Sequence, residues 1–217
     1  MNEHEILDKL RELGSEHNRK GMARFGINTA RALGVGMAAM RPLARELKRE
    51  HELAQALWDT QVHEARILAC LIDDPKQATR AQLERWVVDL DSWDLTDQFC
   101  NKLVVKRPFA WELAVNWAAR EEEFVRRAGF SLMAQLAVHH KAAPDEDFLP
   151  LLELVEGASE DERNFVKKAV NWALRQIGKR SPALRVAAVD TARRLVVRPS
   201  KSARWIARDA LRELDPA

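Results

Sequence analysis

The chain has 217 residues, enough for one domain with a full hydrophobic core. Hydrophobic residues make up 47% of it and charged residues 31%, as in ordinary soluble globular proteins, and its 8 glycines and 8 prolines are too few for the many tight turns of an all-β fold. The N-terminus is charged and amphipathic, unlike a signal peptide, and no run of 18 apolar residues predicts a membrane span. We therefore expect a cytoplasmic protein without membrane attachment.

The net charge is +2, but the charge is unevenly distributed. Residues 1–100 carry 14 basic and 17 acidic side chains, whereas residues 165–217 carry 13 basic and 4 acidic ones. A basic C-terminal quarter favours a polyanionic partner such as nucleic acid. A solvated helical surface rich in arginine is the alternative interpretation.

Apolar residues recur at spacings of three and four along almost the whole chain, which predicts amphipathic helices. Gly14 ends the first helix, Pro75 follows another, and Ser159 with Glu162 predicts a capping box for a later one. The expected helices cover residues 6–13, 37–47, 51–58, 61–72, 79–90, 93–105, 107–119, 122–139, 145–156, 162–177, 182–197 and 201–214.

No segment alternates polar and apolar residues as a strand does, so the predicted class is all-α. Ten or more helices joined by short loops indicate antiparallel helix pairs of about 35–40 residues. Stacked side by side, such pairs form an α–α superhelix of HEAT-like repeats whose concave face can bind a long ligand. We expect residues 1–217 to form one such domain, with a globular helical bundle as the alternative.

Several enzyme classes lack their signatures in this sequence. There is no phosphate-binding GxxxxGK[ST] loop, no GxGxxG after a strand, no HExxH and no CxxC. Cys70 and Cys100 lie within apolar helical patterns and are expected to be buried, and His63 is expected to face a neighbouring helix. We therefore expect neither a metal site nor a cofactor.

Trp93 and Asp97 are spaced four residues apart in the segment SWDLTDQF, so a helix places both on one face. An indole face attracts positive charge and a carboxylate stabilises it, so the pair can hold a cationic group. Asp91 or Ser92 can serve as the N-cap, and Asp94 can interact with the first turn. A surface ion pair of Asp97 with Lys102, or with an arginine of the next helix, is the alternative.

Two later segments offer partners for this pair. Arg127 stands beside small residues in FVRRAGF, where a guanidinium can clamp a phosphate; a salt bridge to Asp97 or to one of Glu121–Glu123 is the alternative. Trp172 is surrounded by basic residues, a pattern suited to a nucleic-acid backbone, or else it belongs to the core. These basic residues are Lys167, Lys168, Arg175, Lys179 and Arg180. The core is the expected place of Trp58, Trp86, Trp111, Trp117 and Trp205.

Taken in order, four segments resemble the AlkD-type DNA alkylation repair family. They are LWDTQVHEARILACLIDDP, RWVVDLDSWDLTDQFC, REEEFVRRAGFSLMAQLAV and DERNFVKKAVNWALRQIGKR, and the resemblance extends over about residues 15–212. It implies an arc of HEAT-like repeats that binds duplex DNA and excises cationic N3- or N7-alkylated purines by hydrolysing the N-glycosidic bond, without flipping the base. Some relatives keep the fold and bind DNA structures without glycosylase activity.

The resemblance also implies roles for individual residues. Trp93, Asp97 and Arg127 match the family's catalytic set, Trp172 matches a second DNA-facing tryptophan, and Phe25 matches, more loosely, an aromatic residue that contacts the backbone. Asp97 would stabilise the oxocarbenium-like sugar and orient the attacking water. The expected protein is a monomeric base-excision glycosylase that acts on double-stranded DNA containing alkylated purines and needs neither metal nor cofactor.

Overall fold

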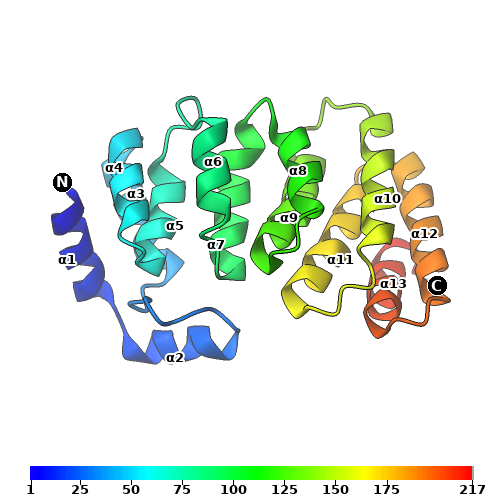
Figure 1. The fold of residues 1–217 in the computed structure, drawn as a ribbon, viewed down its shortest axis with the longest axis horizontal. Coiled ribbons are helices and arrows are strands. Elements are labelled where there is room, and N and C mark those ends of the chain that lie inside the picture. The colour runs from blue at the N-terminus through cyan, green and yellow to red at the C-terminus, as the bar shows by residue number, and fades with distance from the viewer. Residues whose placement is uncertain (217) are drawn as a thin grey trace. The chain divides into compact units, whose positions relative to one another are not determined.

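The computed structural model describes residues 1–216; the last residue of the predicted 1–217 domain lies outside this range. Within it the chain forms thirteen α-helices, short π and 3-10 turns and no strand (Figure 1). The all-α prediction is therefore confirmed. None of these helices is both long and apolar enough to cross a bilayer.

The helices group into two compact units, Met1–Arg107 and the unit that begins at Pro108. One continuous repeat domain stays a prediction.

In the first unit, α5 occupies the centre and contacts α3, α4 and α7. Every residue of α5 except Leu71 is buried, which makes this helix the core of the unit. The helices of the unit are α1 (Glu3–Leu13), α2 (Glu16–Arg24), α3 (Met37–Leu47), α4 (His51–Asp59), α5 (His63–Ile72), α6 (Arg80–Val87) and α7 (Trp93–Gln98). A π turn, Phe99–Leu103, and a 3-10 turn, Val104–Lys106, follow α7.

In the second unit, α9 packs between α8 and α11, and α13 packs against α11 and α12. Helix pairs that contact only their neighbours are the arrangement expected of HEAT-like repeats. The helices are α8 (Ala110–Ala118), α9 (Glu123–His139), α10 (Leu149–Gly157), α11 (Asn164–Gly178), α12 (Pro182–Val196) and α13 (Lys201–Leu214).

Three of the five tryptophans that were expected in the core are buried there. Trp58 and Trp86 are fully buried and stack with their ring centroids 4.1 Å apart, and Trp117 is buried in the second unit. Trp111 is half-buried and packs edge-on against Phe148. The prediction for Trp205 is wrong: its ring is 40% exposed, because the buried face of α13 is formed by other positions.

The helices α8 and α9 approach each other closely at Gly129. A Cβ atom at this position would lie 2.3 Å from the backbone nitrogen of Ala118, closer than any van der Waals contact. The glycine in the FVRRAGF segment is therefore explained by packing between helices. Both cysteines are free and buried, as expected, and burial raises the pKa of the Cys70 thiol.

Besides shifts of a few residues at several helix ends, three predictions about the helices differ from the structure. Helix α2 is not among the predicted helices, because it buries no residue and so has no apolar stripe. The helix expected over 93–105 ends at Gln98 and continues as the π turn. The capping box is wrong, because Arg163 is the N-cap of α11 and the Ser159 hydroxyl donates to the carbonyl of Glu156.

A buried carboxylate fixes the loop that leads into α3. Glu64 is fully buried, and its two oxygens accept hydrogen bonds from the backbone N–H groups of Leu33, Gly34 and Val35 at 2.8, 2.7 and 3.1 Å. Gly34 has a φ of +83°, and a Cβ there would lie 2.1 Å from the carbonyl oxygen of Ser15. The loop thus depends on one glycine and one acid.

Glu64→Leu is expected to lower the free energy of unfolding by about 3 kcal/mol, because it leaves three N–H groups without an acceptor. Glu64→Gln keeps one acceptor oxygen and is expected to cost less. Urea denaturation followed by circular dichroism measures both. Equal stability of Glu64→Leu and the unmodified protein would show that the loop does not depend on this carboxylate.

Candidate functional site

Helix α7 begins where the sequence places an N-cap. Ser92 occupies the cap position, as one of the two alternatives predicted, but its hydroxyl makes no bond to the first turn. The Ser92 Oγ instead accepts from the backbone N–H of Asn28 at 3.0 Å and donates to Asp91 at 3.2 Å. The start of α7 is thereby tied to the segment after α2.

The structure brings Phe25 and Trp93 together. The Trp93 Nε1–H donates to the carbonyl oxygen of Phe25 at 3.1 Å, and the Phe25 ring is 72% exposed at the C-cap of α2. The amide of Asn28 donates to Asp91 at 2.8 Å and reinforces this junction. An exposed ring and a half-buried indole therefore lie at one place on the surface of the first unit.

Asp97 shares α7 with Trp93. Because Trp93–Gln98 is a regular α-helix, the two side chains leave the backbone one turn apart on the same face. Asp97 is half-buried, like Trp93. The arrangement can hold a positively charged group between an indole face and a carboxylate.

Asp94 lies in the first turn of α7, as expected, and also contacts another helix. Its Oδ2 lies 3.0 Å from Nε2 of His63, a buried residue of α5, so His63 faces a neighbouring helix as expected. Burial lowers the pKa of His63, but the hydrogen bond and charge of Asp94, aided by Glu64 and Asp91, outweigh it, so the pKa lies above its ordinary value. Asp94 therefore stabilises a charged imidazole beside the site.

In the second unit, Arg127 is turned into the protein. It lies on α9, is 5% exposed, and its Nη1 donates to the carbonyl of Phe165 at 2.8 Å. This contact spans α9 and α11 and supports the start of α11. The phosphate contact and the salt bridge to an acid both stay predictions.

Helix α11 carries the remaining aromatic and basic candidates. Trp172 is half-buried, Lys168 is exposed, and Lys167 places its Nζ 5.1 Å from the centroid of the Trp205 ring. Gln176, with its amide oxygen turned toward the indole, accepts from Trp172 Nε1 at 3.3 Å. A cation over an exposed indole was not predicted, because the sequence pattern assigned Trp205 to the core.

Arg175 and Lys179 share one acidic partner. Each places a nitrogen 2.7 Å from the carboxylate of Glu213 on α13. The hydrogen bond from Lys179, with that from Arg175, lowers the pKa of Glu213. Both cations remain at the surface, but Glu213 offsets part of their charge.

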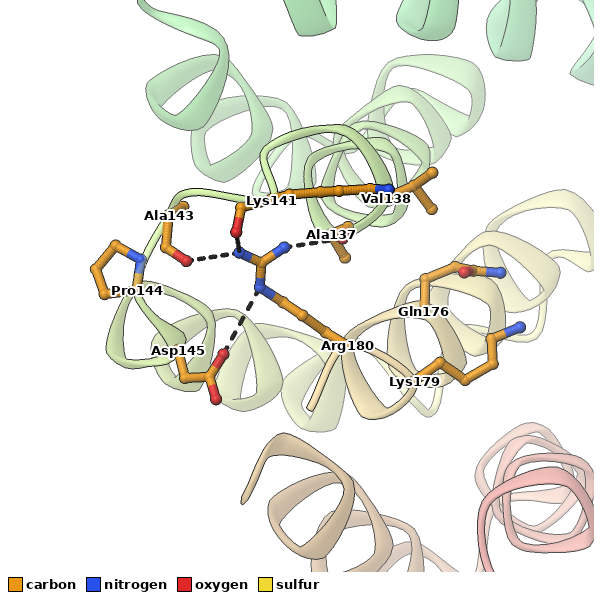
Figure 2. Close-up of a pocket in the computed structure, with 9 residues that line it drawn as sticks. All are labelled: Ala137, Val138, Lys141, Ala143, Pro144, Asp145, Gln176, Lys179 and Arg180. Carbon is orange, nitrogen blue, oxygen red and sulfur yellow. Dashed lines mark hydrogen bonds and ion pairs between the residues drawn. The ribbon is translucent and has the colours of Figure 1, made fainter. Parts of the chain in front are cut away.

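Arg180 binds the carbonyl oxygens at the end of α9 and in the loop that follows it (Figure 2). Its guanidinium donates to the carbonyl oxygens of Ala137, His140, Lys141 and Ala143, and it lies 4.4 Å over the ring of Phe148. Figure 2 shows the side chain directed at the carbonyls of Ala137, Lys141 and Ala143 and at Asp145, while Lys179 points away from them. Arg180 thus caps the C-terminal end of α9, and this geometry does not support the DNA contact predicted for it.

The chain is similar to known proteins over nearly its full length. A solved structure described as "a new family of proteins related to the HEAT-like repeat DNA glycosylases with affinity for branched DNA structures" superposes with a TM-score of 0.82 and 24% identity, over 99% of this chain and 96% of that one. This likeness confirms the HEAT-like helical repeat fold. An engineered protein aligns with a TM-score of only 0.40 and 13% identity, over 97% of this chain and 99% of that one.

None of the curated proteins matches the chain. The model of one protein family, described as DNA alkylation repair enzyme, matches residues 6–214. Since the match extends over almost every residue, the chain belongs to the DNA alkylation repair enzyme family.

Proposed function

We propose that the protein is a DNA glycosylase that hydrolyses the N-glycosidic bond of cationic N3- and N7-alkylated purines in duplex DNA. The observation that carries this proposal is the pair of Trp93 and Asp97 on one face of α7, with the backbone of the exposed residue Phe25 bonded to the Trp93 indole. Family membership supplies the substrate class, DNA, and the process, alkylation repair.

The chemistry of the lesion suits these two side chains. Alkylation at N7 or N3 gives the purine a positive charge, which weakens its bond to the sugar. As the base departs, the sugar becomes oxocarbenium-like, and Asp97 stabilises that charge and orients the attacking water. The face of Trp93 holds the cationic nucleotide by cation–π contact, worth about 0.5–2 kcal/mol. Trp172, on α11 of the second unit, is proposed to contact the DNA. The base remains in the duplex throughout.

The buried position of Arg127 changes the role that we propose for it. Through the carbonyl of Phe165 it fixes the start of α11, the helix that carries Trp172. We therefore propose it as a positioning residue. The residues that would contact the phosphate backbone lie on or next to α11 and are more exposed than Arg127. They are Lys167, Lys168, Arg175 and Lys179.

The protein would act as a monomer in the cytoplasm, without metal or cofactor. A second candidate function is binding of branched DNA without catalysis. The solved structure of similar fold supports this candidate, because that protein is described as having affinity for branched DNA structures.

Base release separates the two candidates. Incubation with methylated duplex DNA should liberate free 7-methylguanine or 3-methyladenine, measured by chromatography, if the protein is a glycosylase. Tight, salt-sensitive binding to a four-way junction, with no free base from methylated duplex, would instead favour the branched-DNA binder.

Glu213 offers a test of the basic surface on α11. Glu213→Gln removes the carboxylate that pairs with Arg175 and Lys179, so Lys179 loses its acidic partner and Arg175 keeps only Asp209, 3.6 Å away; both cations then meet phosphates more readily. DNA affinity is expected to rise several-fold, and the dependence of log affinity on log salt should steepen by about one unit. Glu160→Gln, at an exposed acid elsewhere in the same unit, is the matched control. Unchanged affinity in Glu213→Gln would exclude these two cations from the DNA interface.

A further inference from the structure

A second feature of the first unit lies on another face of α7. A cavity of about 160 Å³ is enclosed by residues of α2, α3, α5 and α7. Its apolar walls come from Met22, Val35, Met37, Met40 and Ile67. Methionine side chains are flexible and polarisable, so three of them around one cavity adapt to the shape of a small ligand.

The polar end of the cavity is formed by Asp94 and Gln98, one turn apart on α7. Asp94 Oδ1 and Gln98 Oε1 are both buried, and neither has a hydrogen-bond donor among residues 1–216. Buried acceptors in native proteins are nearly always paired, with protein or with water or ligand. Two acceptors without a protein donor, on one helix face and lining the same cavity, suit a ligand that brings donors.

The charge of the cavity indicates the kind of donor. Its lining includes the carboxylate of Asp94 and no lysine or arginine. His63 Nε2 is hydrogen-bonded to Asp94 Oδ2, whereas Asp94 Oδ1 remains able to accept a hydrogen bond from a ligand in the cavity. A charge-assisted bond from a cationic N–H to a carboxylate is about twice as strong as a neutral one. A metal ion is less suitable, since residues 1–216 contain no group of three or more acidic, histidine or cysteine side chains that could hold one.

The volume limits the size of the ligand. An apolar cavity of about 150 Å³ in another protein accommodates benzene, so 160 Å³ suits at most one ring and is small for a purine. We propose that this cavity binds a small organic cation with N–H donors, of the amidinium, guanidinium or imidazolium class, through Asp94 Oδ1 and Gln98 Oε1. The site does not depend on the glycosylase function, and Asp94 lies about 100° around α7 from Trp93.

Protonation of His63 competes with such a ligand. The charged groups that act on the His63 ring are Asp94, Glu64 and Asp91, all acids, and they keep it protonated above its ordinary pKa. A protonated ring repels the cation and offsets the charge of Asp94. Affinity should therefore rise as the pH increases through the pKa of His63, provided that the ligand itself stays charged.

Calorimetric titration of the full chain with acetamidinium chloride tests the proposal. Acetamidinium keeps its charge to high pH, carries four N–H groups and has a methyl group for the methionine walls. A dissociation constant below about 1 mM is expected. Acetamide, which has nearly the same shape without the charge, should bind at least about tenfold more weakly. Binding should be tighter at pH 9 than at pH 6.

Two variants and one control locate the binding. Asp94→Asn should weaken acetamidinium binding by about tenfold or more. Gly36→Leu adds a side chain at the exposed edge of the cavity, where a Cβ has no atom within 4 Å, and should obstruct the cavity and weaken binding by about tenfold or more with the fold intact. Asp59→Asn makes the same charge change at an exposed position of α4 and should leave binding unchanged.

Four results would overturn the proposal. They are the absence of heat from acetamidinium, equal binding of acetamide, unchanged binding in Gly36→Leu, and tighter binding of free 3-methyladenine than of acetamidinium. Gly36→Leu decides the matter if Asp94→Asn does not fold. None of these titrations contains DNA, so their outcome is separate from that of the base-release assay.

Discussion

Asp97→Asn is expected to reduce the release of alkylated purines from duplex DNA by about 100-fold or more, while DNA binding stays within a few-fold of normal. The amide has the size of the carboxylate but lacks the charge that stabilises the developing oxocarbenium ion. It also lacks the basicity needed to orient and deprotonate water. Single-turnover release rates and a binding titration with the same methylated duplex measure the two effects separately.

Asp59→Asn is the matched control, because it makes the same substitution at an exposed position of α4 in the same unit. Its release rate should equal that of the unmodified protein. If Asp97→Asn releases base at the normal rate, Asp97 is not the catalytic carboxylate and that group must come from elsewhere. If it loses DNA binding as well, its role is structural.

Trp86→Ala is expected to lower the free energy of unfolding by about 3–5 kcal/mol, the usual cost of deleting a buried aromatic ring. Trp86 is fully buried, stacks on Trp58 with planes 2° apart, and has its ring centroid 6.5 Å from that of Phe99. Phe99 follows α7 directly, so the cavity left by the ring lies beneath the helix that carries Trp93 and Asp97. Base release should fall along with stability.

Trp86→Phe separates the ring from its indole nitrogen. The Trp86 Nε1–H is buried without a hydrogen-bond partner among residues 1–216, so replacing it by a smaller ring removes an unsatisfied donor. Trp86→Phe should therefore cost less than half as much as Trp86→Ala. Urea denaturation followed by circular dichroism measures the free energy of unfolding of both variants. A decrease of less than about 1 kcal/mol in Trp86→Ala would show that the Trp58–Trp86 stack contributes little to the stability of the core.

The helical class could be predicted because it depends on local spacing. Most helices have amphipathic stripes that the sequence displays directly, and α5, which is buried almost throughout, is predicted equally well by its apolar run. Helix α2 escaped detection because none of its residues is buried. The π turn after Gln98 also lacks a signal, since the residues that follow α7 continue the helical pattern.

The candidate site was less predictable, because the partners of its charged groups come from distant helices. Spacing on α11 identifies Arg175 and Lys179 as basic surface residues, but their pairing with Glu213, 38 and 34 residues away respectively, depends on how α13 packs. The same holds for Arg127, whose acceptor is a backbone carbonyl on another helix. A sequence pattern shows side chains but not which backbone carbonyl will accept a hydrogen bond. Arg180, which donates to backbone carbonyls, was unpredictable for the same reason.

The contact between Trp93 and Phe25, in contrast, joins two residues that the sequence had already identified. The resemblance of the sequence to a known family pointed to both residues, and the structure joins them by a hydrogen bond from the indole to the Phe25 carbonyl. The His63–Asp94 pair and the cavity beside it had no sequence signal, because their four helices meet only in the fold.

The most direct test of the central claim uses duplex DNA with a single N7-methylguanine and an excess of protein. We predict time-dependent release of one equivalent of free 7-methylguanine, which leaves an abasic site that alkali converts to a strand break. Full binding of the duplex without release of the base would contradict the claim and leave DNA binding as the function.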